Sequence, residues 1–195
     1  MLRTPAPLKG ALGLIGKRNV KSIRIHYLDA SAAVKLYVSE CGSDALRNYF
    51  EKESHFLMTS LCFSETVGVL KVKYLYREEL AEEDYFSACD ELLAHAAGGS
   101  IEIENVHDLD RSMFIQVERL AKQYNAGKPK DKKLDIADVF QIVSIKQNCF
   151  SSLRQTESEP ILITGDEALA AAARAEGLRV WNCVNEPPPE RRNEA

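Results

Sequence analysis

Residues 22–38 read SIRIHYLDASAAVKLYV, and this stretch decides the fold. Its first part, residues 22–28, is apolar and β-branched, which is typical of a buried strand. Its second part, residues 30–38, is rich in alanine and predicts a helix. Asp29 lies at the turn between them, where open parallel sheets usually carry their chemistry. The stretch therefore predicts one strand-to-helix unit with an acid at its functional end.

The same alternation continues along the chain. Further strands are expected at 55–60, 100–106, 160–164 and 178–182. Helices are expected after residue 43 to about 52, at 60–76, 82–97, 134–149 and 167–176, and up to 124 from a cap at Asp108. This order predicts an α/β fold around a mostly parallel sheet. We expect one domain over residues 23–184, a flexible basic leader over 1–22 and a proline-rich, disordered tail over 185–195.

Composition limits the classes of protein to which the chain can belong. Its 195 residues, 45% of them hydrophobic and 28% charged, are typical of a soluble globular domain. No stretch reaches the ~20 apolar residues of a membrane span. The five cysteines are scattered and never spaced as C-x-x-C, which favours reduced thiols and a cytoplasmic location over disulfides or a zinc site. The four histidines form no recognisable pair of metal ligands.

The net charge of −4 argues weakly against nucleic-acid binding through bulk electrostatics. Two stretches are nevertheless basic, namely residues 9–24 and GKPKDKK at 127–133. Each is either a solvated surface or a contact for phosphates, and the sequence leaves both open. The basic leader suits an organelle transit peptide as well as a flexible segment, and the sequence does not decide between them.

Four carboxylates lie at or near the beginnings of different predicted helices, and they are Asp29, Glu65, Asp138 and Asp166. Each has a purely structural explanation when it is taken alone. Asp29 can cap the helix that follows it. Asp166 falls in the first turn of a helix that Thr164 and Glu167 would begin as a capping box. Glu65 on a solvated helix face would need no explanation.

Together, the four acids are harder to explain by capping. Glu65 lies in so apolar a helix that we expect it to be partly buried, and a buried, unpaired carboxylate is costly. Two like charges ~4 Å apart repel by about 4 kcal/mol at an effective dielectric constant of 20. A bound cation reverses that repulsion, and ligands that are all oxygen suit Mg²⁺ or Mn²⁺.

Four motifs in order resemble the PIN-domain family, and most closely its VapC-type toxin ribonucleases from type II toxin–antitoxin pairs. The motifs are YLDASAAVKLYV-x-E at 27–40, S-x-x-x-x-E at 60–65, LDIADV at 134–139 and LITGDEALA at 162–170. The resemblance covers about residues 27–182. It implies a three-layer α/β/α sandwich around a parallel sheet. It also implies a Mg²⁺- or Mn²⁺-dependent endoribonuclease.

The resemblance assigns catalytic roles to the four acids. Asp29 and Asp138 match the acids that hold the principal ion, and Asp166 contributes directly or through water. Glu65 matches the acid that positions or deprotonates the attacking water, or shares a second ion. In each case it is the residues on either side of the acid that match the family motif.

Three further residues are expected to support this site. Ser31 and Thr164 match polar positions that orient it, and Asp135 is an extra acid one helical turn before Asp138. The chain also departs from the family pattern, because its leader lies outside that pattern and its connector after residue 146 is long. These departures concern the substrate and the partner, since none of them removes an acid.

The predicted function is therefore hydrolysis of RNA phosphodiesters by the toxin of a toxin–antitoxin pair. The alternatives are a PIN-fold module that binds RNA or protein without cutting, a DNA- or structure-specific metal-dependent nuclease, and a phosphatase. The resemblance also implies a small antitoxin partner and a homodimer. The apolar helices at 30–38 and 60–76 are the candidate dimer surfaces.

Overall fold

The computed structural model of the chain describes residues 23–105, 111–146 and 158–190. The predicted leader, the cap at Asp108, the end of the helix predicted at 134–149 and the last five residues of the tail lie outside these ranges. Within them, the helices and strands follow the predicted order. They are β1 (Ile23–Leu28), α1 (Ala30–Tyr37), α2 (Ser43–Phe50), β2 (Phe56–Thr59), α3 (Ser60–Leu75), α4 (Glu82–Ala97), β3 (Ile101–Glu104), α5 (Arg111–Asn125), the short 3-10 helix η1 (Lys130–Lys132), α6 (Ile136–Lys146), β4 (Ser158–Thr164), α7 (Glu167–Ala175) and β5 (Arg179–Asn182).

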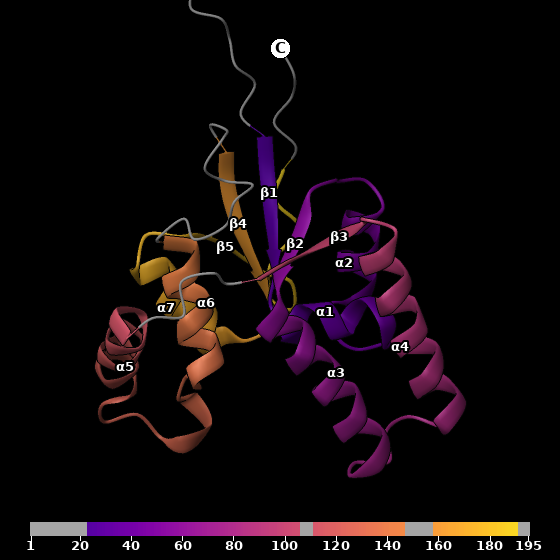
Figure 1. Cartoon of the computed structure of the whole chain (residues 1–195), viewed down its shortest axis with the longest axis horizontal. Helices are drawn as coiled ribbons and strands as arrows, with labels where there is room; N and C mark the ends of the chain where they lie inside the picture. The colour runs from indigo at the N-terminus through magenta and orange to yellow at the C-terminus, as the bar shows by residue number, and fades with distance from the viewer. Residues whose placement is uncertain (1–22, 106–110, 147–157, 191–195) are drawn as a thin grey trace, which may run out of the picture.

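The strands of the described residues form one sheet in the order β3-β2-β1-β4-β5, and every pair is parallel. The chain builds outward from β1 through β2 to β3, and then returns to the other side of β1 to add β4 and β5. The carboxyl ends of β1 and β4 are therefore neighbours where the strand order reverses, which is the usual place of a ligand site in an open α/β sheet. In Figure 1 the arrowheads of these strands point toward the region between α3 and α6.

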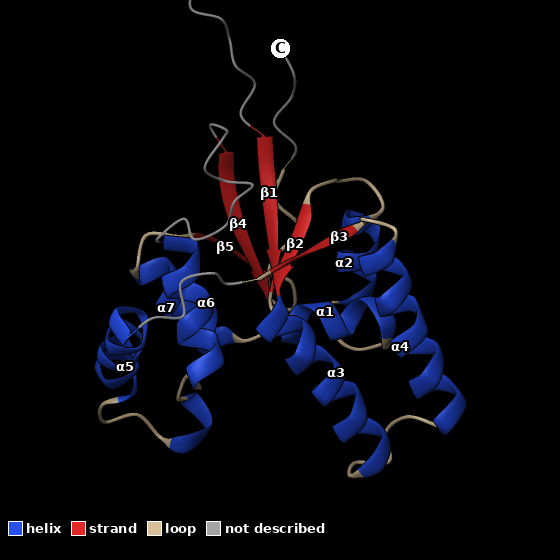
Figure 2. Cartoon of the chain, in the orientation of Figure 1, coloured by secondary structure: helices blue, strands red, loops and turns tan. Residues whose placement is uncertain are grey.

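Helices cover both faces of the sheet. Side chains alternate along β1, so that Ile25 and Tyr27 pack with α5, α6 and α7, whereas Leu28 packs on the opposite face. That opposite face is covered by α1, α2 and α3, and α4 packs against α1 and α3 (Figure 2). The arrangement is a three-layer α/β/α sandwich, so the predicted fold class is confirmed.

The two helices predicted as dimer surfaces differ in exposure. In α1, six of the eight residues are buried, so this helix is part of the core and its prediction as an interface is wrong. By contrast, α3 and the residue after it leave apolar side chains in solvent, namely Leu61, Val72, Leu75 and Tyr76. Only the second predicted surface is thus available to a partner.

Some predictions concern the chain as a whole. Among the described residues, no helix combines the length and the apolar character needed to cross a membrane. The cysteines in these residues are unpaired thiols, and they are Cys41, Cys62, Cys89 and Cys183.

Contacts with the domain continue past residue 184, because Glu186 pairs with Arg174 at 2.6 Å and its carbonyl accepts from Trp181 Nε1 at 3.1 Å.

Gly42 occupies a close approach between two loops. Its φ is +88°, and a Cβ there would clash with the carbonyl oxygen of Cys183. We expect Gly42→Ala to lower the free energy of unfolding by about 2–4 kcal/mol, because backbone strain adds to steric overlap. Urea denaturation measures the loss. Gly177→Ala is the matched control, since Gly177 has a φ of +84° but nothing within 4 Å, and equal losses for the two variants would contradict the argument.

Candidate active site

Asp29 lies at the carboxyl end of the central strand. The register of β1 with β4 pairs Leu28 with Ile163, so Asp29 lies beside Thr164. Asp29 is also the N-cap of α1, because its side chain accepts a hydrogen bond from Ser31 N at 3.1 Å. The capping explanation of this acid is therefore correct but incomplete. The residue is only 4% exposed, and its carboxylate has further donors.

Two hydroxyl groups orient the Asp29 carboxylate. Thr164 Oγ1 donates to Asp29 Oδ2 at 2.9 Å, and Ser31 Oγ donates to the same oxygen. Each hydroxyl also accepts from the backbone after β4, since Gly165 N donates to Ser31 Oγ at 2.8 Å and Asp166 N donates to Thr164 Oγ1 at 2.9 Å. A hydroxyl has one proton, so these arrangements direct both protons at Asp29. The two residues predicted to orient the site thus contact its first acid.

Glu65 and Asp138 approach the site from α3 and α6. Glu65 lies in the second turn of α3, is half-buried and accepts no hydrogen bond from the part of the chain that the structure describes. Asp138 lies in the first turn of α6. Asp135 N donates to Asp138 Oδ2 and Asp138 N donates to Asp135 Oδ1, both at 2.9 Å. This reciprocal pair makes Asp135 the cap of α6 and fixes the Asp138 side chain.

Asp166 is the fourth acid and begins α7. Its Oδ1 accepts from Leu169 N at 2.9 Å, so Asp166 is itself the N-cap. The predicted capping box of Thr164 and Glu167 is wrong, because the Thr164 hydroxyl serves Asp29 instead. The sequence does not show this difference, since it depends on the neighbouring strand.

Three of the acids have raised pKa values, and burial is the largest cause for each. Burial, followed by the charges of Asp29 and Asp135, raises the pKa of Glu65 to about 7. Burial, followed by the same two charges, raises the pKa of Asp138 to about 8. Burial also raises the pKa of Asp29, although its hydrogen bonds from Ser31 and Thr164 oppose the shift. Acids perturbed by one another and by burial are typical of functional sites.

The four predicted acids and Asp135 line one cleft of about 290 Å³, here named the acidic cleft. The same cleft is lined by charged residues to which the sequence assigned no role, namely Lys35, Glu40, Lys73 and Arg77. Two of them fall inside the motif at 27–40, and Lys73 interrupts an apolar helix. The position of Lys73 in an otherwise apolar stretch is a weak signal, because Lys71 lies in the same stretch and does not line the cleft.

The donor set of the acidic cleft fits a hard divalent cation. Its acidic ligands are all carboxylates, which Mg²⁺ and Mn²⁺ prefer. Within residues 23–105, 111–146 and 158–190, no three His, Cys, Asp or Glu side chains already have the spacing of a bound ion. The residues that would hold an ion are Asp29, Asp138 and Asp166, and Asp29 is oriented by the most hydrogen bonds.

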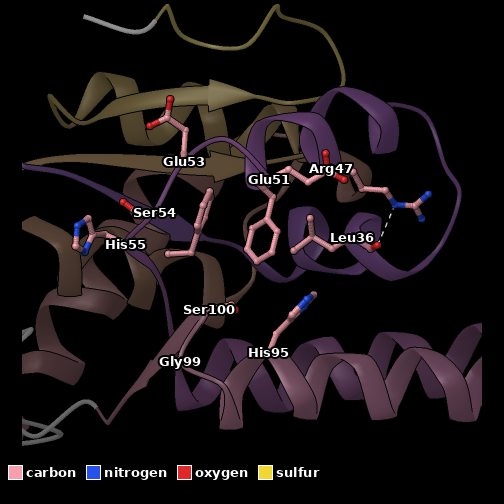
Figure 3. Close-up of a pocket in the computed structure, with 11 residues that line it drawn as sticks. Leu36, Arg47, Glu51, Glu53, Ser54, His55, His95, Gly99 and Ser100 are labelled. Atoms are coloured by element: carbon pink, nitrogen blue, oxygen red, sulfur yellow. Dashed lines mark hydrogen bonds between the residues drawn. The ribbon is translucent and has the colours of Figure 1, made fainter. Parts of the chain in front are cut away.

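A larger cavity, of about 570 Å³, lies away from the acids (Figure 3). It opens near the amino ends of β2 and β3, whereas the acids lie at the carboxyl ends of the strands. In this cavity, Arg47 Nε donates to the carbonyl oxygen of Leu36 at 2.9 Å. None of the predicted site residues lines it, so cavity volume does not locate the predicted chemistry.

No protein-family model and no curated protein matches the chain. Solved structures that are similar to it include the following two. One is Mycobacterium tuberculosis VapC20, described as a Sarcin-Ricin loop cleaving toxin, with 9% identity and a TM-score of 0.49 over 75% of this chain and 94% of that one. The other is PAE2754 from Pyrobaculum aerophilum, with 17% identity and a TM-score of 0.47 over 83% of this chain and 91% of that one.

Proposed function

We propose that the chain is a metal-dependent endoribonuclease that hydrolyses RNA phosphodiester bonds. One observation carries the proposal, namely that acids from four distant parts of the chain line a single cleft at the carboxyl ends of parallel strands. Such a cluster is electrostatically costly, and its raised pKa values record that cost. A hard cation would neutralise part of this negative charge, and the bound cation would in turn attract the anionic phosphodiester. The sequence resemblance to VapC-type ribonucleases supports RNA as the substrate.

Asp29, Asp138 and Asp166 are the proposed metal ligands. Asp29 has the donors of Ser31 and Thr164 directed at one oxygen, so its carboxylate is oriented before any ligand arrives. Asp138 is held by Asp135 N. When bound, Mg²⁺ or Mn²⁺ polarises the phosphoryl oxygen and lowers the pKa of a bound water.

Glu65 is the proposed proton acceptor. It accepts no hydrogen bond from the described residues, so its carboxylate oxygens are available to an attacking water. In the metal-free chain, burial and then the charges of Asp29 and Asp135 raise its pKa above the ordinary value of a glutamate, which makes it a stronger base. In the proposed reaction the water oxygen bonds to phosphorus and its proton passes to a Glu65 carboxylate oxygen. The P–O bond to the leaving ribose oxygen breaks, and that oxygen keeps the electron pair and takes up a proton from solvent to become a hydroxyl group.

A substrate comparison tests the proposal. With Mg²⁺, the purified chain is expected to cut a labelled single-stranded RNA and to leave a matched single-stranded DNA and p-nitrophenyl phosphate intact. Chelation by EDTA is expected to stop the cutting, and Mg²⁺ to restore it. If DNA is cut as fast as RNA, the chain is a general nuclease and not a ribonuclease. If p-nitrophenyl phosphate is hydrolysed, the chain is a phosphatase. RNA binding with no cutting by any preparation would favour a binding module.

The proposed biological role is that of a toxin controlled by a small antitoxin protein. A cationic side chain of that partner, such as an arginine, would pair with the carboxylates of the acidic cleft. The exposed apolar side chains at the end of α3, Leu75 and Tyr76, are the proposed surface of a homodimer. Growth arrest on expression of the wild-type chain, relieved by a protein encoded beside it, would test this role.

A further inference from the structure

We propose that Lys35 and Lys73 form a phosphate-binding wall of the acidic cleft and hold the phosphate next to the one that is cut. Glu40 is their shared counter-ion, and the three residues are here named the lysine wall. The inference rests on the proposed nuclease function, and it adds positioning residues that neither the motifs nor the acids supply.

The lysine wall joins two helices through one carboxylate. Lys35 Nζ, from α1, donates to Glu40 Oε2 at 2.8 Å. Lys73 Nζ, from α3, pairs with Glu40 Oε1, and also with Glu79 Oε2 at 2.6 Å. Glu40 thus contacts both ammonium groups with different oxygens. Each ammonium has three donors, so neither is used up by these contacts.

The wall is fixed in place before any ligand arrives. The side chains of Lys35 and Lys73 are each only 10% exposed, yet both residues line the acidic cleft. The backbone of Glu40 is held by Ser43, whose Oγ accepts from Glu40 N at 2.9 Å and donates to the Val38 carbonyl at 2.8 Å. Ordering these long side chains in advance lowers the entropic cost of binding an anion.

Packing places Lys35 against the acids. A Cβ on Gly165 would lie 2.7 Å from Lys35 Cε, so the stem of Lys35 occupies the space that this glycine leaves. Gly165 N in turn donates to Ser31 Oγ, which donates to Asp29. The stem of the Lys35 side chain therefore runs beside the residues that orient the first acid, and its ammonium extends to Glu40, where it meets Lys73.

The charges of the wall are complementary to a polyanion. Glu40 is the one carboxylate that pairs with Lys35 in the described residues, and Lys73 pairs with Glu79 as well as with Glu40. Arg77 also pairs with Glu79 and lines the cleft, so three cations stand against two carboxylates here. Burial alone would lower the pKa of Lys73, but its contacts with Glu40 and Glu79 outweigh burial and raise it, so this lysine stays charged. The opposite side of the cleft is acidic and repels a phosphate. The wall therefore supplies attraction that the acids lack.

Distance along α3 separates the wall from the reacting phosphate. Lys73 follows Glu65 by eight residues, which is about 12 Å along a helix. Lys73 therefore lies nearer to the next phosphate of a bound strand than to the phosphate beside Glu65. The lysine wall accordingly contacts a neighbouring phosphate of the same strand, which makes it a positioning element for a nucleic-acid chain longer than one nucleotide.

A purely structural ion-pair network is the competing explanation. It predicts that Glu40→Gln and the lysine variants harm the protein in the same way, because each breaks the network. The lysine wall predicts opposite effects on RNA affinity for the lysine variants and for Glu40→Gln. Removing a lysine removes attraction for RNA, whereas removing the Glu40 charge frees Lys35 from its counter-ion and leaves Lys73 paired with Glu79 alone.

RNA binding by the full chain tests the inference. The probe is a fluorescein-labelled single-stranded RNA of mixed sequence, followed by anisotropy over a range of salt concentrations with Ca²⁺ in place of Mg²⁺. Lys35→Met and Lys73→Met are each expected to weaken binding about tenfold. Each is also expected to reduce the slope of log K against log salt by about 0.7, the value for one phosphate contact of a single strand. In cleavage assays KM rises while kcat changes little.

Two further variants make the result decisive. Glu40→Gln is expected to bind the RNA about threefold more tightly than the wild type. Lys71→Met is the matched control, because Lys71 is an exposed lysine on the same helix and does not line the cleft, and it is expected to bind like the wild type. If the lysine-to-methionine variants do not fold, Glu40→Gln decides alone, and weaker binding by that variant overturns the inference.

The outcomes separate this inference from the proposed function. Lysine variants that bind RNA like Lys71→Met overturn the lysine wall even if the wild type cuts RNA. If the wild type never cuts RNA, the proposed nuclease function is wrong. If the lysine variants nevertheless bind RNA more weakly and with a smaller salt dependence, phosphate binding by the lysine wall is still supported.

Discussion

Asp29→Asn is expected to lower RNA cleavage by at least about 100-fold while the protein stays folded. The amide keeps one oxygen, which can accept from Ser31 and Thr164 as Asp29 Oδ2 does now. Its NH₂ group then replaces the second carboxylate oxygen and turns donors toward the place of a cation. The variant thus keeps the cap of α1, because asparagine is as good an N-cap as aspartate, and loses a metal ligand.

Single-turnover cleavage of a labelled RNA with Mg²⁺ measures the loss, and circular dichroism checks the fold. Asp44→Asn is the matched control, because Asp44 is an exposed aspartate in the first turn of α2 and does not line the acidic cleft. This control is expected to cut RNA at the wild-type rate. Full activity of Asp29→Asn would remove Asp29 from the site, and with it the proposed mechanism.

The metal-free protein is expected to lose stability as pH rises from about 5 to 8. Asp138 and Glu65 have pKa values of about 8 and about 7 in the folded state, against ordinary values of 3.8 and 4.5. Between these limits the folded state binds more protons than the unfolded state, so the slope of the unfolding free energy with pH is negative. The stabilisation is complete below the ordinary pKa values and disappears as pH passes the folded ones.

Thermal unfolding in EDTA measures this effect. The Tm is expected to fall by at least about 5 °C between pH 5 and 8, since one pKa unit is worth about 1.4 kcal/mol before solvent screening and about 1 kcal/mol moves the Tm by about 2–4 °C. Mg²⁺ is expected to raise the Tm most at pH 8, because a cation favours the charged carboxylates.

Asp138→Asn provides the comparison for the pH experiment. Without the ionisable group, its Tm in EDTA is expected to depend less on pH and to exceed that of the wild type at pH 8. Its response to Mg²⁺ is expected to be much smaller. A Tm of the wild type that stays level from pH 5 to 8 in EDTA would show that the acids do not strain one another in the folded state.

Much of the fold could be predicted from local patterns. The strand at 22–28, the helix at 82–97 and the helix beginning at Ser60 agree with β1, α4 and α3 to within about one residue. Periodicity and turn residues act over one or two helical turns, so a sequence records them directly. The burial of α1 could not be predicted in this way, because an apolar helix has the same sequence pattern whether it packs on the sheet of its own chain or on a partner.

The sequence by itself predicted the order of strands and helices and an α/β fold, and its resemblance to a known family implied the three-layer class and the roles of the four acids. Only the tertiary structure decided how these residues are used. It directed the Thr164 hydroxyl to Asp29 and away from α7, made Asp166 the cap of that helix, and brought Lys73 and Lys35 to one carboxylate. The contacts of Thr164 with Asp29 and of Lys73 with Glu40 join residues far apart in the sequence, whereas the Asp166 cap and the Lys35–Glu40 pair are local. Their energies depend on strand register, helix packing and burial, which no local pattern of residues contains.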